Sequence, residues 1–104
     1  MAKNLSNKEF QELLQSENTL ILDVRTYGEC CQGIIPGALN IDIMSQDFLT
    51  KLSELPKDKQ LLVYCRSGNR SSMACGLIER QGFKVVYNLG RGILGWDGEV
   101  VDFN

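Results

Sequence analysis

The chain has 104 residues, which suffices for one modest hydrophobic core. Its 11 lysines and arginines against 13 aspartates and glutamates give a formal net charge of −2, so it offers no basic field for nucleic acid or an anionic membrane. Its apolar windows fall short of the roughly 20 residues that span a bilayer, and its first residues lack the apolar stretch of a signal peptide. We therefore expect a single cytoplasmic domain over residues 1–104, with neither nucleic-acid nor membrane partners.

The first part of the chain carries a helix signal followed by a strand signal. Ser6 and Glu9 have the spacing of a capping box at a helix start. Leu5 and Phe10 are placed around it as a hydrophobic staple. The continuous apolar run over residues 19–24 is typical of a strand that is buried on both faces.

The middle of the chain continues this alternation. After a loop over residues 25–37, a shorter strand is expected at 38–43. Apolar side chains then recur at helical spacing over residues 48–55, until Pro56 ends the helix. Residues 60–65 form the next buried strand.

A last helix and a last strand complete the pattern. We expect a helix over residues 71–81, capped by Gly82, and a strand over 84–89. Alternating strands and helices imply right-handed crossovers and parallel pairing. The sequence thus predicts an α/β fold, with a parallel sheet of about four to five strands flanked by helices on both faces in three layers.

Gly90, Gly92 and Gly95 match the glycine spacing of a dinucleotide-binding fingerprint after a strand. That fingerprint also needs a full helix, a further strand and an acidic residue about 20 positions on, whereas only nine residues follow Gly95. We interpret these glycines as tight turns that let Trp96 fold back onto the core. No cofactor is expected.

Four cysteines are few for a disulfide-held chain, so reduced thiols are expected. They are Cys30, Cys31, Cys65 and Cys75. The chain has no histidine, and no two cysteines have the short spacing of a structural zinc site or of a thioredoxin-like redox motif. We therefore expect no metal. We also expect Cys31 on the surface of the loop, and Cys30 to be a small buried hydrophobic residue.

Cys65 ends a predicted central strand, and open α/β sheets bind ligands at the carboxyl ends of such strands. The polar residues 66–70 follow it, including Gly68 and Asn69, which tolerate a positive φ. Such a loop turns successive backbone N–H groups toward one atom, and the helix that starts near Ser71 adds its positive end. Because two arginines reinforce this field, we expect a Cys65 pKa well below the ordinary value of about 8.5. A buried structural cysteine would leave the arginines and the glycine unexplained.

Four motifs, in order and at familiar spacings, resemble the rhodanese-like domain family. They are LDVR at 22–25, GIIPGALNI at 33–41, CRSGNR at 65–70 and NLGRGILGW at 88–96. The resemblance covers nearly the whole chain and implies a single-domain sulfurtransferase in which Cys65 carries a transferable sulfur as a persulfide. Two positions depart from the family pattern, because Ile34 stands where histidine is usual and Cys30 where an aromatic residue is usual.

The resemblance also implies roles for the residues around Cys65. The cradle for the sulfur would be formed by Arg66, Ser67, Gly68, Asn69 and Arg70. Asp23 would steady the loop, and Arg25 would hold the surrounding segment by ion pairing. These last two roles are structural.

The residues fit this chemistry without help from the family. A thiolate that attacks the outer sulfur of thiosulfate or a polysulfide expels sulfite or a shorter polysulfide, and no general base is needed, which suits a chain without histidine. A thiol, cyanide or a protein cysteine would then take the sulfur from Cys65. The expected partners are therefore a small sulfur-containing anion and a thiol or protein acceptor.

Two alternatives stay open. The loops of cysteine-dependent phosphatases and arsenate reductases carry an oxyanion-binding arginine after a cysteine and five further residues; here that position is Ser71, and Arg70 comes one residue early. The shorter ring suits a single sulfur atom better than a tetrahedral oxyanion. The other alternative is a non-catalytic sulfur carrier or protein-binding module, which the sequence does not separate from a catalyst.

Overall fold

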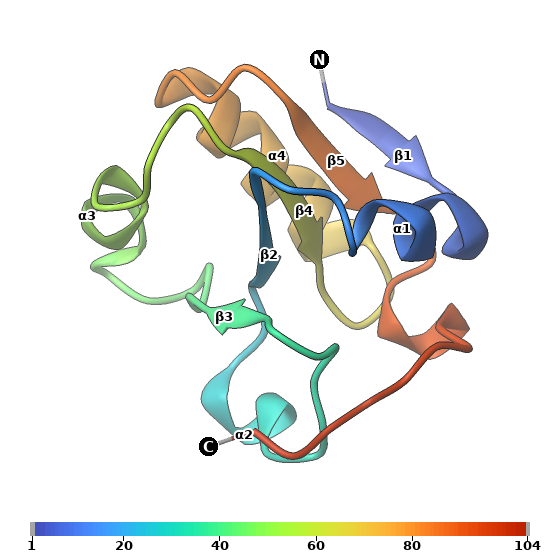
Figure 1. The fold of residues 1–104 in the computed structure, drawn as a ribbon. Coiled ribbons are helices and arrows are strands. Elements are labelled where there is room, and N and C mark those ends of the chain that lie inside the picture. Colours follow the sequence, from blue (N-terminus) through green and yellow to red (C-terminus); the bar gives the residue numbers. More distant parts are fainter. Residues whose placement is uncertain (1, 104) are drawn as a thin grey trace.

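A five-stranded sheet forms the centre of the computed structural model, which describes residues 2–103 (Figure 1). Its strands are β1 (Lys3–Leu5), β2 (Thr19–Asp23), β3 (Leu39–Asn40), β4 (Gln60–Tyr64) and β5 (Val86–Leu89). They lie in the order β1-β5-β4-β2-β3, and the pairing between each two neighbours is parallel. This sheet confirms the predicted α/β fold. Residues 1 and 104, the ends of the predicted single domain, lie outside the described part, and the domain assignment stays a prediction.

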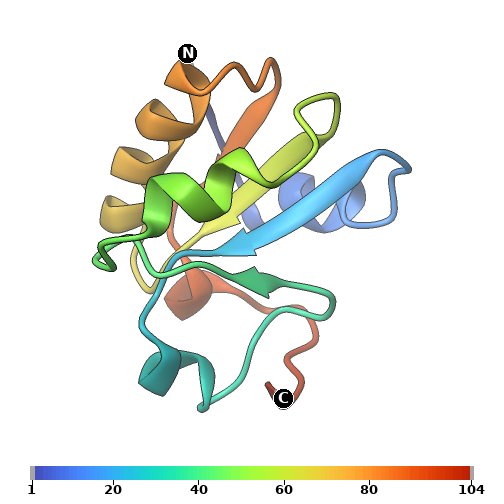
Figure 2. The same ribbon diagram turned by 90° about the vertical axis from the view of Figure 1, so that its left-hand side faces the viewer.

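The helices cover both faces of the sheet, as predicted (Figure 2). One face carries α1 (Asn7–Leu13), and the other carries α3 (Phe48–Ser53) and α4 (Asn69–Arg80). A short helix, α2 (Tyr27–Cys30), and a 3-10 turn, η1 (Ile93–Gly95), follow the carboxyl ends of β2 and β5. Within residues 2–103, no helix is long and apolar enough to cross a membrane.

Alternating residues of β4 pack into two separate cores. Leu61 and Val63 belong to the cluster that contains the buried side chains of α3 and α4. Leu62 and Tyr64 belong to the cluster that contains Phe10 of α1. All four of these β4 side chains are fully buried. Because neither face of this central parallel strand meets solvent, its sequence is a continuous apolar run.

The start of α1 has the predicted caps. Ser6 Oγ accepts a hydrogen bond from the Glu9 backbone N–H at 3.2 Å, and the Glu9 carboxylate accepts one from the Ser6 N–H at 2.9 Å. Leu5 and Phe10 lie in one core cluster, as a staple requires. Trp96 packs edge-on against Phe10 with ring centroids 5.8 Å apart, so the chain folds back onto the core after the glycine turns.

Several elements differ from the sequence prediction. The strands β3 and β5 and the helix α3 are shorter than the expected ranges 38–43, 84–89 and 48–55. Three other elements differ as well. The prediction lacks β1, because only three residues pair at this edge of the sheet and two of them are polar. Helix α2 lies inside the predicted loop and was not predicted. It has only four residues, capped by Thr26 and Glu29, which are too few to show apolar periodicity. Helix α4 starts at Asn69, two residues early, because Gly68 ends the loop with a left-handed φ of 101°.

The buried hydroxyl of Tyr64 connects β4 to the segment after α2, because it accepts a hydrogen bond from the Ile35 backbone N–H at 3.1 Å. Tyr64→Phe leaves that buried N–H without its partner, so we expect a loss of about 1–2 kcal/mol in the free energy of unfolding, measured by urea denaturation. Tyr27→Phe is the control, since its side chain is exposed and the expected change is within about 0.5 kcal/mol. Equal losses in the two variants would contradict this role of the Tyr64 hydroxyl.

Candidate active site

Cys65 follows β4 at the carboxyl end of the sheet, where β4 lies between β2 and β5. The residue is only 1% exposed. Its Sγ accepts hydrogen bonds from the Gly68 backbone N–H at 3.1 Å and from the Ser71 hydroxyl at 3.3 Å. The loop of residues 66–70 thus closes around the sulfur, and the first turn of α4 supplies a further donor.

The surroundings of Cys65 favour its thiolate. Burial raises the pKa of this thiol, but the hydroxyl and N–H of Ser71 and the N–H groups of Gly68 and Ser67 lower it by more. The net pKa therefore lies below the ordinary value of a cysteine, in the direction that the sequence predicts. The same donors are suited to hold an anionic atom bound to Sγ.

Ser71 is a sulfur contact that sequence reasoning missed. Its hydroxyl is fully buried and lies 3.2 Å from the Gly68 carbonyl oxygen as well as near Sγ. Because a hydroxyl has one proton, a thiolate at Cys65 draws that proton away from the carbonyl. The Asn88 side chain also donates to this carbonyl at 3.4 Å, so the carbonyl keeps a partner. In the sequence, the signal for this contact is a serine at the start of the helix that follows the loop.

Gly92 lets the turn after β5 pack directly on the loop around Cys65. Its φ is 67°, and a Cβ at this position would overlap the Arg66 carbonyl. The next two residues bind the loop, because the Ile93 N–H donates to the Cys65 carbonyl at 2.9 Å and the Leu94 N–H to the Arg66 carbonyl at 3.0 Å. This glycine therefore serves the loop as well as the turn that returns Trp96 to the core.

The two arginines of the loop differ in their surroundings. Arg70 forms a two-point ion pair with Glu29 of α2, with N–O distances of 2.7 and 2.8 Å. The Arg70 hydrogen bonds lower the pKa of Glu29 to about 2. Arg66 is exposed, and within residues 2–103 no carboxylate lies at ion-pair distance from it. Ser67 and Asn69 are exposed as well, whereas Gly68 is buried.

Asp23 and Arg25 form a buried ion pair beside the site. Arg25 Nη2 lies 2.7 Å from Asp23 Oδ2, and the two side chains are 5% and 0% exposed. Arg25 also donates to the Gly33 carbonyl at 2.8 Å. Four hydrogen bonds join the Asp23 side chain to Arg25, and in the described part of the chain none joins it to residues 66–70. The pair thus steadies residues 25–33, and Asp23 reaches the loop around Cys65 only indirectly.

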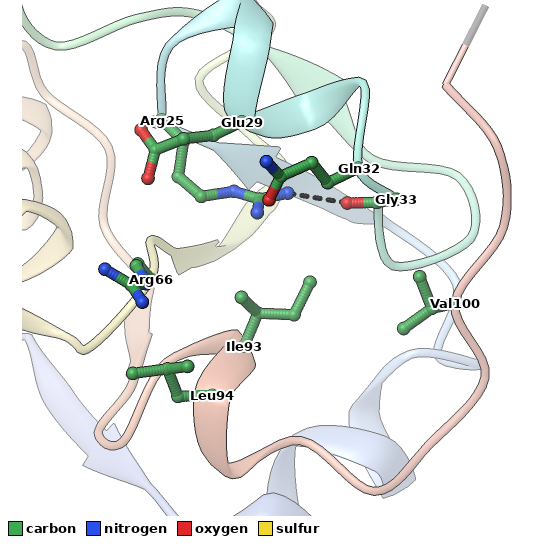
Figure 3. A pocket seen from close by; sticks show the side chains of 8 residues that line it. All are labelled: Arg25, Glu29, Gln32, Gly33, Arg66, Ile93, Leu94 and Val100. Atoms are coloured by element: carbon green, nitrogen blue, oxygen red, sulfur yellow. Dashed lines mark hydrogen bonds between the residues drawn. The ribbon is translucent and has the colours of Figure 1, made fainter.

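A pocket of about 540 Å³ lies beside the loop around Cys65 (Figure 3). Its lining residues are Arg25, Glu29, Gln32, Gly33, Arg66, Ile93, Leu94 and Val100. The polar groups of residues 25–33 line one side, with Val100 packed beside Gly33. Ile93 and Leu94 lie on the other side, and these three side chains form the apolar wall of the pocket (Figure 3). Sequence reasoning missed this apolar wall and Glu29, since neither belongs to the segment around Cys65.

Two of the other three cysteines, Cys30 and Cys75, are not activated. Cys30 and Cys75 are buried, and burial raises the pKa of each thiol to about 12. Cys31 is exposed, and all four cysteines are free. Over the described residues 2–103, no three His, Cys, Asp or Glu side chains are grouped in a way that would hold a metal ion.

Comparisons with known proteins identify a family. The family model described as Rhodanese-like domain matches residues 6–99. A protein of Allochromatium vinosum named Sulfurtransferase is 42% identical over 86 residues, which are 83% of this chain and 78% of that protein. YtwF of Bacillus subtilis is 37% identical over 98 residues, which are 93% of this chain and 92% of YtwF. The crystal structure of a rhodanese-like domain protein from Staphylococcus aureus has a TM-score of 0.84 and 26% identity, over 98% of this chain and 99% of that one.

Removing the Ser71 hydroxyl is expected to raise the pKa of Cys65. Ser71→Ala deletes one donor to Sγ, which corresponds to a rise of about 1 in the pKa. The thiolate, present above the pKa, is then lost at a higher pH as the solution is acidified. Thiolate ultraviolet absorbance against pH measures this, in a Cys31→Ser background that removes the exposed thiol. An unchanged pKa would show that the hydroxyl bonds to the Gly68 carbonyl instead.

Gly92→Ala tests the contact between the turn and the loop around Cys65. The added Cβ meets the Arg66 carbonyl, so the loop must move and its donors lose their alignment with Sγ. We expect the pKa of Cys65 to rise toward the ordinary value of about 8.5 in the same titration. Gly76→Ala is the matched control, because a Cβ there would meet nothing within 4 Å beyond its chain neighbours and the backbone of its own helix. Equal pKa changes in the two variants would contradict the role of Gly92.

Proposed function

Since this chain belongs to the rhodanese-like domain family, we propose that it is a sulfurtransferase in which Cys65 accepts a sulfane sulfur and holds it as a persulfide. The ring of hydrogen-bond donors around Sγ carries this proposal. It lowers the pKa of the attacking thiol, and it suits an anionic outer sulfur. The 42% identity to a protein named Sulfurtransferase supports the same activity.

In the first half-reaction, the Cys65 thiolate attacks the outer sulfur of thiosulfate or a polysulfide. A new S–S bond of about 2.05 Å forms at Sγ, while the S–S bond of the donor breaks. Its electron pair leaves with sulfite or a shorter polysulfide. Because both leave as anions, the step requires no proton donor.

In the second half-reaction, a thiolate, cyanide or a protein cysteine attacks the outer sulfur of the persulfide. The electron pair of the breaking S–S bond returns to Sγ, and the products are a new persulfide or thiocyanate. Two successive steps at one sulfur give ping-pong kinetics, and neither step needs histidine, which the chain lacks. We propose the cytoplasm as the compartment, because the four cysteines are free thiols and a reducing compartment keeps such thiols from forming disulfides.

The surroundings of Cys65 disfavour phosphatase or arsenate reductase chemistry. Ser71 stands where such loops carry the oxyanion-binding arginine, and its hydroxyl contacts Sγ. Arg70, one residue earlier, is held by Glu29. A non-catalytic sulfur carrier stays the second candidate, since a carrier would need the same persulfide at Cys65.

Intact-protein mass spectrometry after incubation with thiosulfate or polysulfide tests the persulfide. We expect a gain of about 32 Da, one sulfur atom, that is lost on adding cyanide or a thiol. Cys65→Ser should gain nothing, whereas Cys31→Ser, which removes the exposed thiol, should load like the wild type. A persulfide that persists in Cys65→Ser would place the sulfur on another cysteine and overturn the proposal.

Turnover assays then separate a catalyst from a carrier. A catalyst transfers sulfur repeatedly to small thiols or cyanide, whereas a carrier loads once and waits for a protein partner. Hydrolysis of an aryl phosphate that disappears in Cys65→Ser would instead favour the phosphatase alternative.

A further inference from the structure

All but one of the charged side chains that line the pocket form an ion pair. Arg25 is neutralised by Asp23, and Glu29 by Arg70. Arg66 lines the pocket without an ion partner in residues 2–103. The pocket therefore presents one net positive charge, although three arginines lie in or beside it.

Glu29 is the residue that removes the charge of Arg70 from the site. Both carboxylate oxygens bind the guanidinium, at 2.7 and 2.8 Å, in the planar two-point geometry that makes such pairs strong. Glu29 also accepts from the Thr26 N–H and so belongs to the capping box of α2. Its carboxylate is therefore fixed in place from two sides.

The pocket is also larger and more apolar than an inorganic sulfur anion requires. Thiosulfate is only a few water molecules in size, and one water occupies about 30 Å³, whereas the pocket measures about 540 Å³. Pockets of this size commonly hold organic ligands. Ile93 and Leu94 supply carbon surface on the side facing residues 25–33, and Val100 supplies more beside Gly33 (Figure 3). The side chains of Leu94 and Val100 are exposed.

From this charge balance and this wall, we propose that Glu29 determines the substrate class of the site. By neutralising Arg70 it disfavours inorganic dianions such as thiosulfate and sulfite, and favours monoanionic organic persulfides and thiolates whose carbon stems lie on Leu94 and Val100. The inference rests on the proposed function, because it concerns the ligands that exchange sulfur with Cys65.

The exchange balances without any further reagent. The Cys65 thiolate attacks the outer sulfur of an organic persulfide anion, the donor S–S bond breaks, and its electron pair leaves on the organic sulfur. One proton taken up from water gives the leaving thiol, and Cys65 holds the persulfide anion. The reverse attack, by another organic thiolate, returns the electron pair to Sγ and forms a new organic persulfide.

Discharge of a preloaded protein tests the inference. The wild type is loaded with inorganic polysulfide, desalted and mixed with either sulfite, the dianion, or phenylmethanethiol, the organic thiol. Mass spectrometry follows the loss of the added sulfur. Glu29→Gln should accelerate discharge to sulfite roughly tenfold, because Arg70 then adds an unmatched charge, and should change discharge to the thiol less than about twofold. Glutamine is an accepted capping-box residue, so the variant retains the cap of α2.

Two further variants complete the design. Glu17→Gln makes the same charge change before β2, at the opposite end of that strand from the site, and should leave both rates unchanged. Leu94→Ser should slow discharge to phenylmethanethiol about threefold and leave sulfite unaffected, since it removes only exposed carbon surface.

The outcomes separate this inference from the function it rests on. Failure of polysulfide to load the wild type overturns the proposed function and the inference together. Normal loading, with an unchanged ratio of the sulfite and thiol rates in Glu29→Gln, overturns the inference alone. Normal loading with a raised sulfite rate only in Glu29→Gln, and a lowered thiol rate only in Leu94→Ser, establishes it.

Discussion

Direct packing of backbone on backbone, between the loop around Cys65 and the turn after β5, is the constraint on which the site depends. Gly68 lies against the Gly90 carbonyl and Gly92 against the Arg66 carbonyl, so neither glycine has room for a side chain. N–H groups of the turn bind the carbonyls of Cys65 and Arg66. The Gly68 N–H of the loop faces the sulfur instead. Donors that are fixed in this way before a ligand arrives need no reorganisation during the reaction.

Two ion pairs surround this loop, and their burial gives them different functions. The Asp23–Arg25 pair is almost fully buried, so the loss of one partner would leave an unpaired charge in the core at a cost of about 3–5 kcal/mol. The Glu29–Arg70 pair is about a quarter exposed, and such pairs contribute little to stability. The buried pair therefore maintains the fold, whereas the exposed pair sets the charge that a ligand meets.

Local signals in the sequence account for most of the secondary structure and for the central residue of the site. The capping box of Ser6 and Glu9 depends only on residues three positions apart, so its residue types mark the helix start in the sequence. Strands β2 and β4 are buried on both faces, so each appears in the sequence as a continuous apolar run. Helix α2 was not predicted, because four residues are too few to show the apolar periodicity of a helix. Cys65 is the predicted central residue because the residue types that lower a thiol pKa follow it directly in the chain, and the structure bears out the direction of that pKa shift.

The sequence by itself determined the alternation of strands and helices, the parallel sheet that follows from it, and the thiol at the end of the central strand. Only the tertiary structure decided which residues from distant parts of the chain lie around that thiol. Glu29 meets Arg70 across 41 positions, and the apolar wall comes from the last part of the chain. The physical reason is that periodicity and capping act within a few residues, whereas the charge and shape of a pocket arise from side chains that only folding brings together.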